Sequence, residues 1–176
     1  MNKLKIGMVG MGFIADWHHQ GFAKVPEAEI TGMTQDLYGD ENKQKDLIKR
    51  LHDKCSQWNI KPYDSFDDMV SDPGIDALII GSVNPLHYEQ IRKAVANKKH
   101  LMVEKPVVLN MGHMKSVKHL IKETGAKLFP GHNFVYRNTI IKARDIIDSG
   151  KIGQIVHASF IISHTISKTH ATGWRT

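Results

Sequence analysis

A short apolar run that ends in a glycine-rich turn opens the chain and constrains its fold more than any other feature. Leu4 to Val9 has the composition of a buried strand, and the turn Gly10-Met11-Gly12-Phe13-Ile14-Ala15 leads into a helical pattern of apolar and aromatic residues. A G-x-G-x-x-A sequence between a strand and a helix is the context of a dinucleotide-binding turn. On the motif alone, a tight connection that binds nothing is the alternative.

The small residues of this turn have separate physical roles. Gly10 can adopt the backbone conformation of a tight turn because it has no Cβ. Gly12 lets backbone N–H groups approach a pyrophosphate, and Ala15 lets the helix pack closely on the strand. The helix N-terminus adds unpaired N–H groups and a dipole that favours phosphate. We therefore expect a dinucleotide at this turn.

Strand and helix patterns alternate over the first 131 residues. Further strands are predicted at 30–34, 77–80, 100–103 and 127–130, and helices at 13–25, 40–58, 65–70 and 110–123. The segment 77–80 is a continuous apolar run, which is typical of a parallel strand covered on both faces. The alternation predicts an α/β fold with a doubly wound parallel sheet.

The pattern changes after residue 131. A helix is predicted at 136–148 and a long alternating strand at 155–163, with no helix after it. This favours the opening of a second, α+β domain. We expect one domain at 1–131 and the start of another at 132–176, and we expect the chain to carry only a truncated part of the second.

Asp36 is the candidate ligand for the adenosine ribose. It follows the second predicted strand, about 20 residues beyond the glycines, where a carboxylate binds the ribose hydroxyls of NAD. A solvated turn residue is the alternative. Gln35 could bond a ribose without charge, and no Arg follows at once to hold a 2′-phosphate. The sequence therefore favours NAD and leaves NADP open.

The segment that follows the strand at 77–80 carries polar candidates for the site. Gly81-Ser82-Val83-Asn84-Pro85-Leu86-His87 follows the strand at 77–80, and Asn84 is predicted to cap the next helix with Pro85 at its first position. His87 shares the inward face of that helix, so it is either a ligand-facing residue or a buried histidine with satisfied nitrogens. His18 and His19 are predicted to be packed or solvated.

Lys105 is the candidate for chemistry. The strand at 100–103 delivers Glu104-Lys105-Pro106 to the carboxyl edge of the sheet. A lysine there can hydrogen-bond a substrate hydroxyl or carbonyl and stabilise developing negative charge. A solvated edge lysine is the alternative, and an ion pair with Glu104 is possible.

Composition excludes several classes of function. The net charge is +6 without a basic tract, which argues against nucleic acid. The single cysteine, Cys55, excludes an internal disulfide and fits a reducing compartment. No long apolar segment suggests a signal peptide or a membrane span, and no histidine spacing suggests a metal site. We expect a cytoplasmic protein without metal.

The chain resembles the Gfo/Idh/MocA family of NAD(P)-dependent oxidoreductases. The resemblance rests on motifs in family order and spacing: the glycine turn at 10–15, His18, Asn84-Pro85-Leu86-His87, Val103-Glu104-Lys105-Pro106, Gly131-His132-Asn133 and the turn at 148–153. It implies a Rossmann domain followed by a crossover helix into a domain for substrate binding and oligomerisation. It also implies hydride transfer between the nicotinamide and a sugar or polyol, and a homo-oligomer if the second domain is present.

The resemblance assigns roles to residues of this chain. Lys105 is implied to lie beside the nicotinamide and to contact the hydroxyl that is oxidised, and a histidine in an Asp-x-x-x-His motif of the second domain is implied as general base. The residues expected to bind the cofactor are Gly10, Gly12, Phe13, Ile14, Asp36, Ser82, Asn84, His87, Glu104 and Lys105.

The chain departs from the family pattern in three ways. Gln35 occupies the slot where the family often has Asp, and Val135 stands where many members carry Arg. The Asp-x-x-x-His motif is not reached, and neither His164 nor His170 has a carboxylate at that spacing. The sequence thus predicts the cofactor half of a dehydrogenase. A truncated, non-catalytic nucleotide-binding or interaction module is the alternative.

Overall fold

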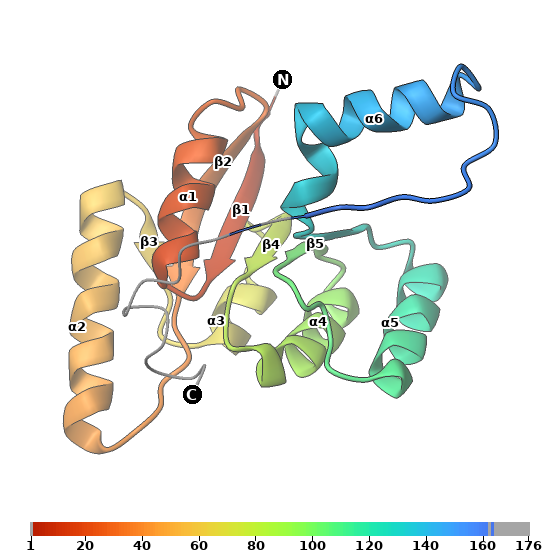
Figure 1. Cartoon of the computed structure of the whole chain (residues 1–176). Coiled ribbons are helices and arrows are strands. Elements are labelled where there is room, and N and C mark those ends of the chain that lie inside the picture. Colours follow the sequence, from red (N-terminus) through yellow and green to blue (C-terminus); the bar gives the residue numbers. More distant parts are fainter. Residues whose placement is uncertain (1, 162, 164–176) are drawn as a thin grey trace. The chain divides into compact units, whose positions relative to one another are not determined.

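The structure, a computed structural model, describes residues 2–161 and residue 163, which include a six-stranded sheet in the order β3-β2-β1-β4-β5-β6 (Figure 1). The strands are β1 Leu4–Val9, β2 Ala28–Thr34, β3 Lys61–Pro62, β4 Ala77–Ile80, β5 His100–Val103 and β6 Leu128–Pro130. All neighbouring strands run parallel. This confirms the predicted doubly wound sheet. The short edge strand β3 is an addition that the sequence pattern does not predict.

Helices connect the strands. They are α1 Phe13–Phe22, α2 Glu41–Trp58, α3 Phe66–Ser71, α4 His87–Ala96, α5 Met111–Thr124 and α6 Asn138–Asp148, with 3₁₀ turns η1 Asn84–Leu86 and η2 Asn133–Tyr136. The first helix is predicted to reach residue 25 but ends at Phe22. The next residues form turns in which Ala23 N–H donates to His19 O and Val25 N–H to Phe22 O.

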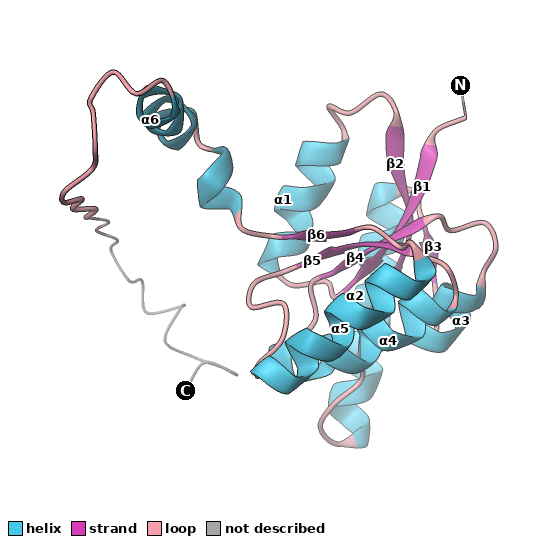
Figure 2. Cartoon of the chain, turned by 90° about the vertical axis from the view of Figure 1, so that its right-hand side faces the viewer, coloured by secondary structure: helices cyan, strands magenta, loops and turns pink. Residues whose placement is uncertain are grey.

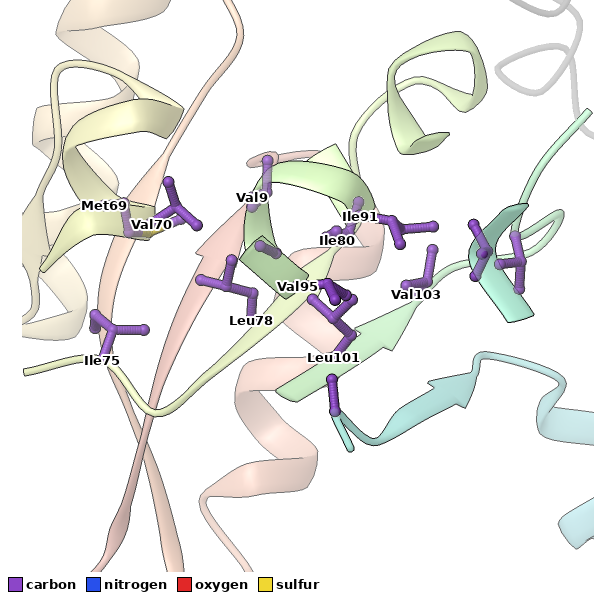
Figure 3. Packing of buried hydrophobic residues seen from close by; sticks show 14 of the residues in the cluster. Val9, Met69, Val70, Ile75, Leu78, Ile80, Ile91, Val95, Leu101 and Val103 are labelled. Carbon is purple, nitrogen blue, oxygen red and sulfur yellow. The ribbon is translucent and has the colours of Figure 1, made fainter. Parts of the chain in front are cut away.

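Apolar side chains cover both faces of the sheet. Successive strand residues point to opposite faces, so β1 and β4 contribute to two layers. In one layer, strand residues pack against α3, α4 and α5, as Figure 3 shows for Val9, Leu78, Ile80, Ile91, Val95 and Val103. The other layer joins Ile6, Met8, Met33 and Ile79 to Ala15 of α1 and Leu47, Leu51 and Cys55 of α2. Figure 2 shows α1 and the pair α4 and α5 on opposite sides of the sheet.

Local capping explains several helix starts. Asp40 and Ser65 accept hydrogen bonds from Lys43 N–H and Asp68 N–H, and Asn110 Oδ1 accepts one from His113 N–H at 2.8 Å. The predicted cap by Asn84 is wrong. Asn84 lies inside η1, which precedes α4 and has no side-chain cap bond. Leu86 N–H donates to Val83 O and tightens this turn, so α4 begins only at His87.

The chain divides into two compact units, residues 1–131 and 132–176. The second unit contains η2 and α6. The strand predicted at 155–163 does not form in its described residues, and residue 162 lies outside them. A strand requires a partner for its backbone N–H and C=O groups, and no described segment pairs with this one. No described helix is long and apolar enough to cross a membrane.

Candidate cofactor site

The candidate site lies at the carboxyl ends of β1, β2, β4 and β5, all within the first unit. Within the sheet, β2 lies next to β1 on one side and β4 lies next to β1 on the other side. The loops after β1 and β4 therefore diverge, and open α/β sheets bind ligands in the crevice at such a switch point. The glycine turn occupies this position.

Gly10 shapes the turn. Its φ is +94°, and its N–H donates to Thr34 O at 2.9 Å. A Cβ added there would lie 2.6 Å from Gly81 O, closer than real Cβ atoms approach. Only glycine fits both the backbone conformation and the contact with the loop after β4. Gly10 therefore has a folding role that requires no ligand.

Gly12 has a different environment. Its backbone is extended, with φ −64° and ψ 178°, and it is the N-cap of α1 without a side-chain capping bond. A Cβ added at Gly12 would meet nothing within 4 Å. The first turn of a helix has N–H groups without intrahelical acceptors, and its dipole attracts anions. Open space at this helix end fits a pyrophosphate.

Gln35 and Asp36 have separate partners at the end of β2. Gln35 Oε1 accepts a hydrogen bond from Met11 N–H at 2.9 Å, and its amide donates to Asp36 O. Gln35 therefore holds the glycine turn to β2. The Asp36 carboxylate instead accepts from Gln90 Nε2, at 3.1 and 3.0 Å from its two oxygens.

Gln90 links Asp36 to the loop after β4. Its side chain is buried, and its Oε1 accepts a hydrogen bond from Ser82 Oγ at 2.5 Å. Burial raises the pKa of Asp36 above its ordinary value, although the hydrogen bond from Gln90 opposes the shift. Gln90 is not among the residues that the sequence predicts for this site. Its position one helical turn after His87 was the only available signal.

His87 is enclosed between two loops. It is 0% exposed, with Nδ1 2.9 Å from Pro106 O and Nε2 3.1 Å from Ser82 O. Both partners are carbonyl oxygens, so a neutral ring donates to one of them and a protonated ring to both. The structure therefore favours the second alternative for His87, a buried histidine with polar partners. It connects the loop after β4 to the loop after β5.

The loop after β5 presents Lys105. Glu104 N–H donates to Ile80 O at 2.9 Å, and Lys105 itself is exposed. The Glu104 carboxylate does not pair with the Lys105 ammonium: it lies 2.9 Å from His18 Nε2, and its other oxygen accepts from Lys105 N–H at 3.3 Å. Burial raises the pKa of Glu104, but the hydrogen bond and charge of His18, together with the backbone N–H and the charge of Lys105, lower it further, so the pKa lies below its ordinary value.

Most of the predicted residues gather at this edge. Phe13 and Ile14 begin α1, and Ser82 and Asn84 lie in the segment between β4 and α4. His18 joins them through Glu104, although it was predicted only as packed or solvated. The described residues contain no group of three or more His, Cys, Asp or Glu side chains that could hold a metal ion.

Comparisons with known proteins agree with this geometry. A family model described as "Oxidoreductase family, NAD-binding Rossmann fold" matches residues 4–132. Scyllo-inositol 2-dehydrogenase (NAD(+)) of Bacillus subtilis (strain 168) is 27% identical over 157 residues, covering 89% of this chain and 43% of that protein. 2,7-Anhydro-N-acetylneuraminate hydratase of Escherichia coli (strain K12) is 36% identical over 153 residues, covering 87% and 38%.

Among solved structures, scyllo-inositol dehydrogenase from Lactobacillus casei with bound NAD(H) and scyllo-inositol matches with a TM-score of 0.74 and 26% identity. The match covers 86% of this chain and 43% of that one. The chain thus spans less than half the length of these relatives. It belongs to the Gfo/Idh/MocA oxidoreductase family and contains that family's NAD-binding Rossmann fold.

Proposed function

We propose that the chain forms the cofactor-binding half of a dehydrogenase that transfers hydride between a nicotinamide and a sugar, polyol or related hydroxyl or carbonyl substrate. The observation that carries the proposal is the open N-terminus of α1 at Gly12, with an exposed lysine on the loop after β5. NAD, when bound, supplies the hydride acceptor. The inositol dehydrogenases among the relatives support a polyol as substrate class.

Different residues would bind different parts of the cofactor. Gly12 and the first turn of α1, with Phe13 and Ile14, would hold the pyrophosphate. Asp36 would accept hydrogen bonds from the adenosine ribose, since Gln90 uses only part of the acceptor capacity of its carboxylate. Its negative charge disfavours a 2′-phosphate, which supports NAD over NADP.

Lys105 is the proposed catalytic residue. Its ammonium group would donate a hydrogen bond to the substrate oxygen and stabilise the negative charge that develops there. Ser82, Asn84 and Glu104 would line the nicotinamide end of the site, Ser82 and Glu104 being held by Gln90 and His18. His87 would contribute by holding the two loops rather than by contact.

We assign the general base to the part of the fold beyond the matched region. The relatives are more than twice as long as the stretch that they share with this chain. Residues 132–176 would begin a domain for substrate binding and oligomerisation. Hydride transfer from a hydroxyl needs a general base beside a positioned nicotinamide, and we assign no residue of the 176-residue chain as that base, so we expect the chain to bind cofactor with little turnover.

Calorimetric titration with NADH and with NADPH tests this proposal. We expect micromolar affinity for NADH, weaker binding of NADPH, and little reduction of NAD⁺ when scyllo- or myo-inositol is added. Absence of NADH binding to a folded chain would refute the proposal and favour a non-catalytic module. Rapid turnover by the chain alone would refute the assignment of the base.

A second candidate is the addition of water to an anhydro sugar. The hydratase shares 36% of its aligned residues with this chain, more than the inositol dehydrogenases share. The two candidates differ in their products. A dehydrogenase accumulates NADH with product, whereas a hydratase forms product without net change in absorbance at 340 nm.

A further inference from the structure

His18 connects the two ends of the candidate site. It lies on α1, the helix whose N-terminus faces the proposed pyrophosphate position, and its Nε2 is 2.9 Å from Glu104 Oε1. The two residues are 86 positions apart in sequence. Their side chains are 13% and 15% exposed, so the contact is largely shielded from water. Such a contact constrains geometry more than an exposed ion pair does.

Glu104 has contacts at its backbone and at both of its carboxylate oxygens. Its backbone N–H donates to Ile80 O, and its second carboxylate oxygen accepts from Lys105 N–H. Gly131 packs against it closely: a Cβ added at Gly131 would lie 3.2 Å from Glu104 Oε1 and 3.2 Å from Glu104 Cα. The carboxylate therefore has little freedom, and it holds the backbone of Lys105 through one of its oxygens.

We propose that His18 is a positioning residue that acts through Glu104. It fixes the backbone of Lys105 relative to the N-terminus of α1, and so fixes the distance between the pyrophosphate and the nicotinamide end of the site. This inference rests on the proposed function and deepens it. It gives His18 a specific role at the nicotinamide end, whereas a histidine that only stabilises the fold would influence the whole site equally.

Two ligands separate these roles. ADP-ribose has the adenosine, pyrophosphate and second ribose of NADH but lacks the nicotinamide. We expect the wild-type chain to bind NADH more tightly than ADP-ribose. In His18→Leu, the ratio of the two affinities is expected to fall about fivefold to tenfold, because the loop that carries Lys105 loses its anchor. The affinity for ADP-ribose is expected to stay within about twofold of wild type.

Matched variants sharpen the test. His18→Gln places an amide donor near the position of Nε2 and is expected to restore most of the ratio. His19→Leu changes the neighbouring histidine, whose ring stacks on Trp58 with centroids 4.0 Å apart, and is expected to leave the ratio unchanged. Glu104→Gln is expected to lower the ratio as well, and the double variant His18→Leu with Glu104→Gln is expected to lower it by less than the product of the two single effects, because the two changes share one contact.

Each outcome decides the proposal. Equal losses for NADH and ADP-ribose in His18→Leu, or no loss for either, would overturn it and leave the proposed function intact. A folded wild-type chain that binds neither ligand would overturn both. Circular dichroism establishes that each variant is folded. If His18→Leu does not fold, His18→Asn replaces it, since the shorter amide does not reach Glu104, and the same change in ratio is expected.

Discussion

Alanine substitutions at Gly10 and Gly12 separate folding from ligand binding within one turn. The two residues are two positions apart, yet an added Cβ meets backbone at one and open space at the other. At Gly12 two small terms oppose each other. Alanine is a poorer N-cap than glycine, but it also lowers the entropy of the unfolded chain. We expect Gly12→Ala to change the free energy of unfolding by less than about 1 kcal/mol.

Gly10→Ala is expected to be much more costly. A side chain at φ +94° is strained, and its Cβ would lie 2.6 Å from Gly81 O and 2.9 Å from Gly81 C. The strained conformation alone costs about 1–3 kcal/mol. Because the obstructing atoms are backbone, relief requires the loop after β4 to move. We expect a total loss of about 2–4 kcal/mol, measured by urea denaturation followed by circular dichroism.

A binding assay tests the second role, that of Gly12. The Gly12→Ala methyl group would project into the proposed pyrophosphate position and displace charged hydrogen bonds, which are worth about 1.5–3 kcal/mol each. We expect NADH affinity to fall about tenfold to a hundredfold in a fluorescence titration, with stability nearly unchanged. Wild-type affinity in Gly12→Ala would show that the pyrophosphate does not lie there. Wild-type stability in Gly10→Ala would refute the argument from strain.

Three other substitutions test separate features. Lys99 is buried and its Nζ donates to Asp72 O and Ile75 O at 2.7 and 2.6 Å, so Lys99→Met should cost about 2–3 kcal/mol in urea denaturation; no loss would contradict this role. Asp36→Asn should weaken NADH binding about tenfold in calorimetry and NADPH binding less; equal losses would contradict ribose contact. The pKa of Glu104 lies below its ordinary 4.5, so its stabilisation is full above that value and lost as pH falls through the native pKa. Glu104→Gln should therefore destabilise at about pH 7 but less at about pH 3, and a constant difference would contradict this.

The sheet could be predicted because its residues are constrained locally. Ala77–Ile80 is apolar at every position, and all four residues are buried because helices cover both faces. The glycine turn could also be predicted, because glycines at this spacing between a strand and a helix are typical of a tight turn that binds a dinucleotide. Asn110 and Ser65 predicted helix starts because a capping bond spans only three residues.

The features that could not be predicted from the sequence depend on tertiary contacts. Lys61–Pro62 is a strand because it pairs with β2 at the edge of the sheet. A segment of two residues is too short to show a periodic pattern of apolar residues. The alternation at 155–163 resembles a strand, but its described residues have no partner. The pairing of His18 with Glu104 and of Gln90 with Asp36 joins residues 86 and 54 positions apart. No spacing rule connects such residues, so the histidine appeared to be an ordinary packed residue.

We propose that NAD lies across the glycine turn with its nicotinamide near Lys105. The most direct measurement is the change in backbone ¹⁵N–¹H NMR signals when the chain is titrated with NADH and, separately, with ADP-ribose. We predict shifts at Gly12 and Ile14 with both ligands, shifts near Lys105 with NADH alone, and little change at Val117, which is buried where α5 packs against the sheet. Shifts confined to α5, or none at saturating NADH, would contradict the account.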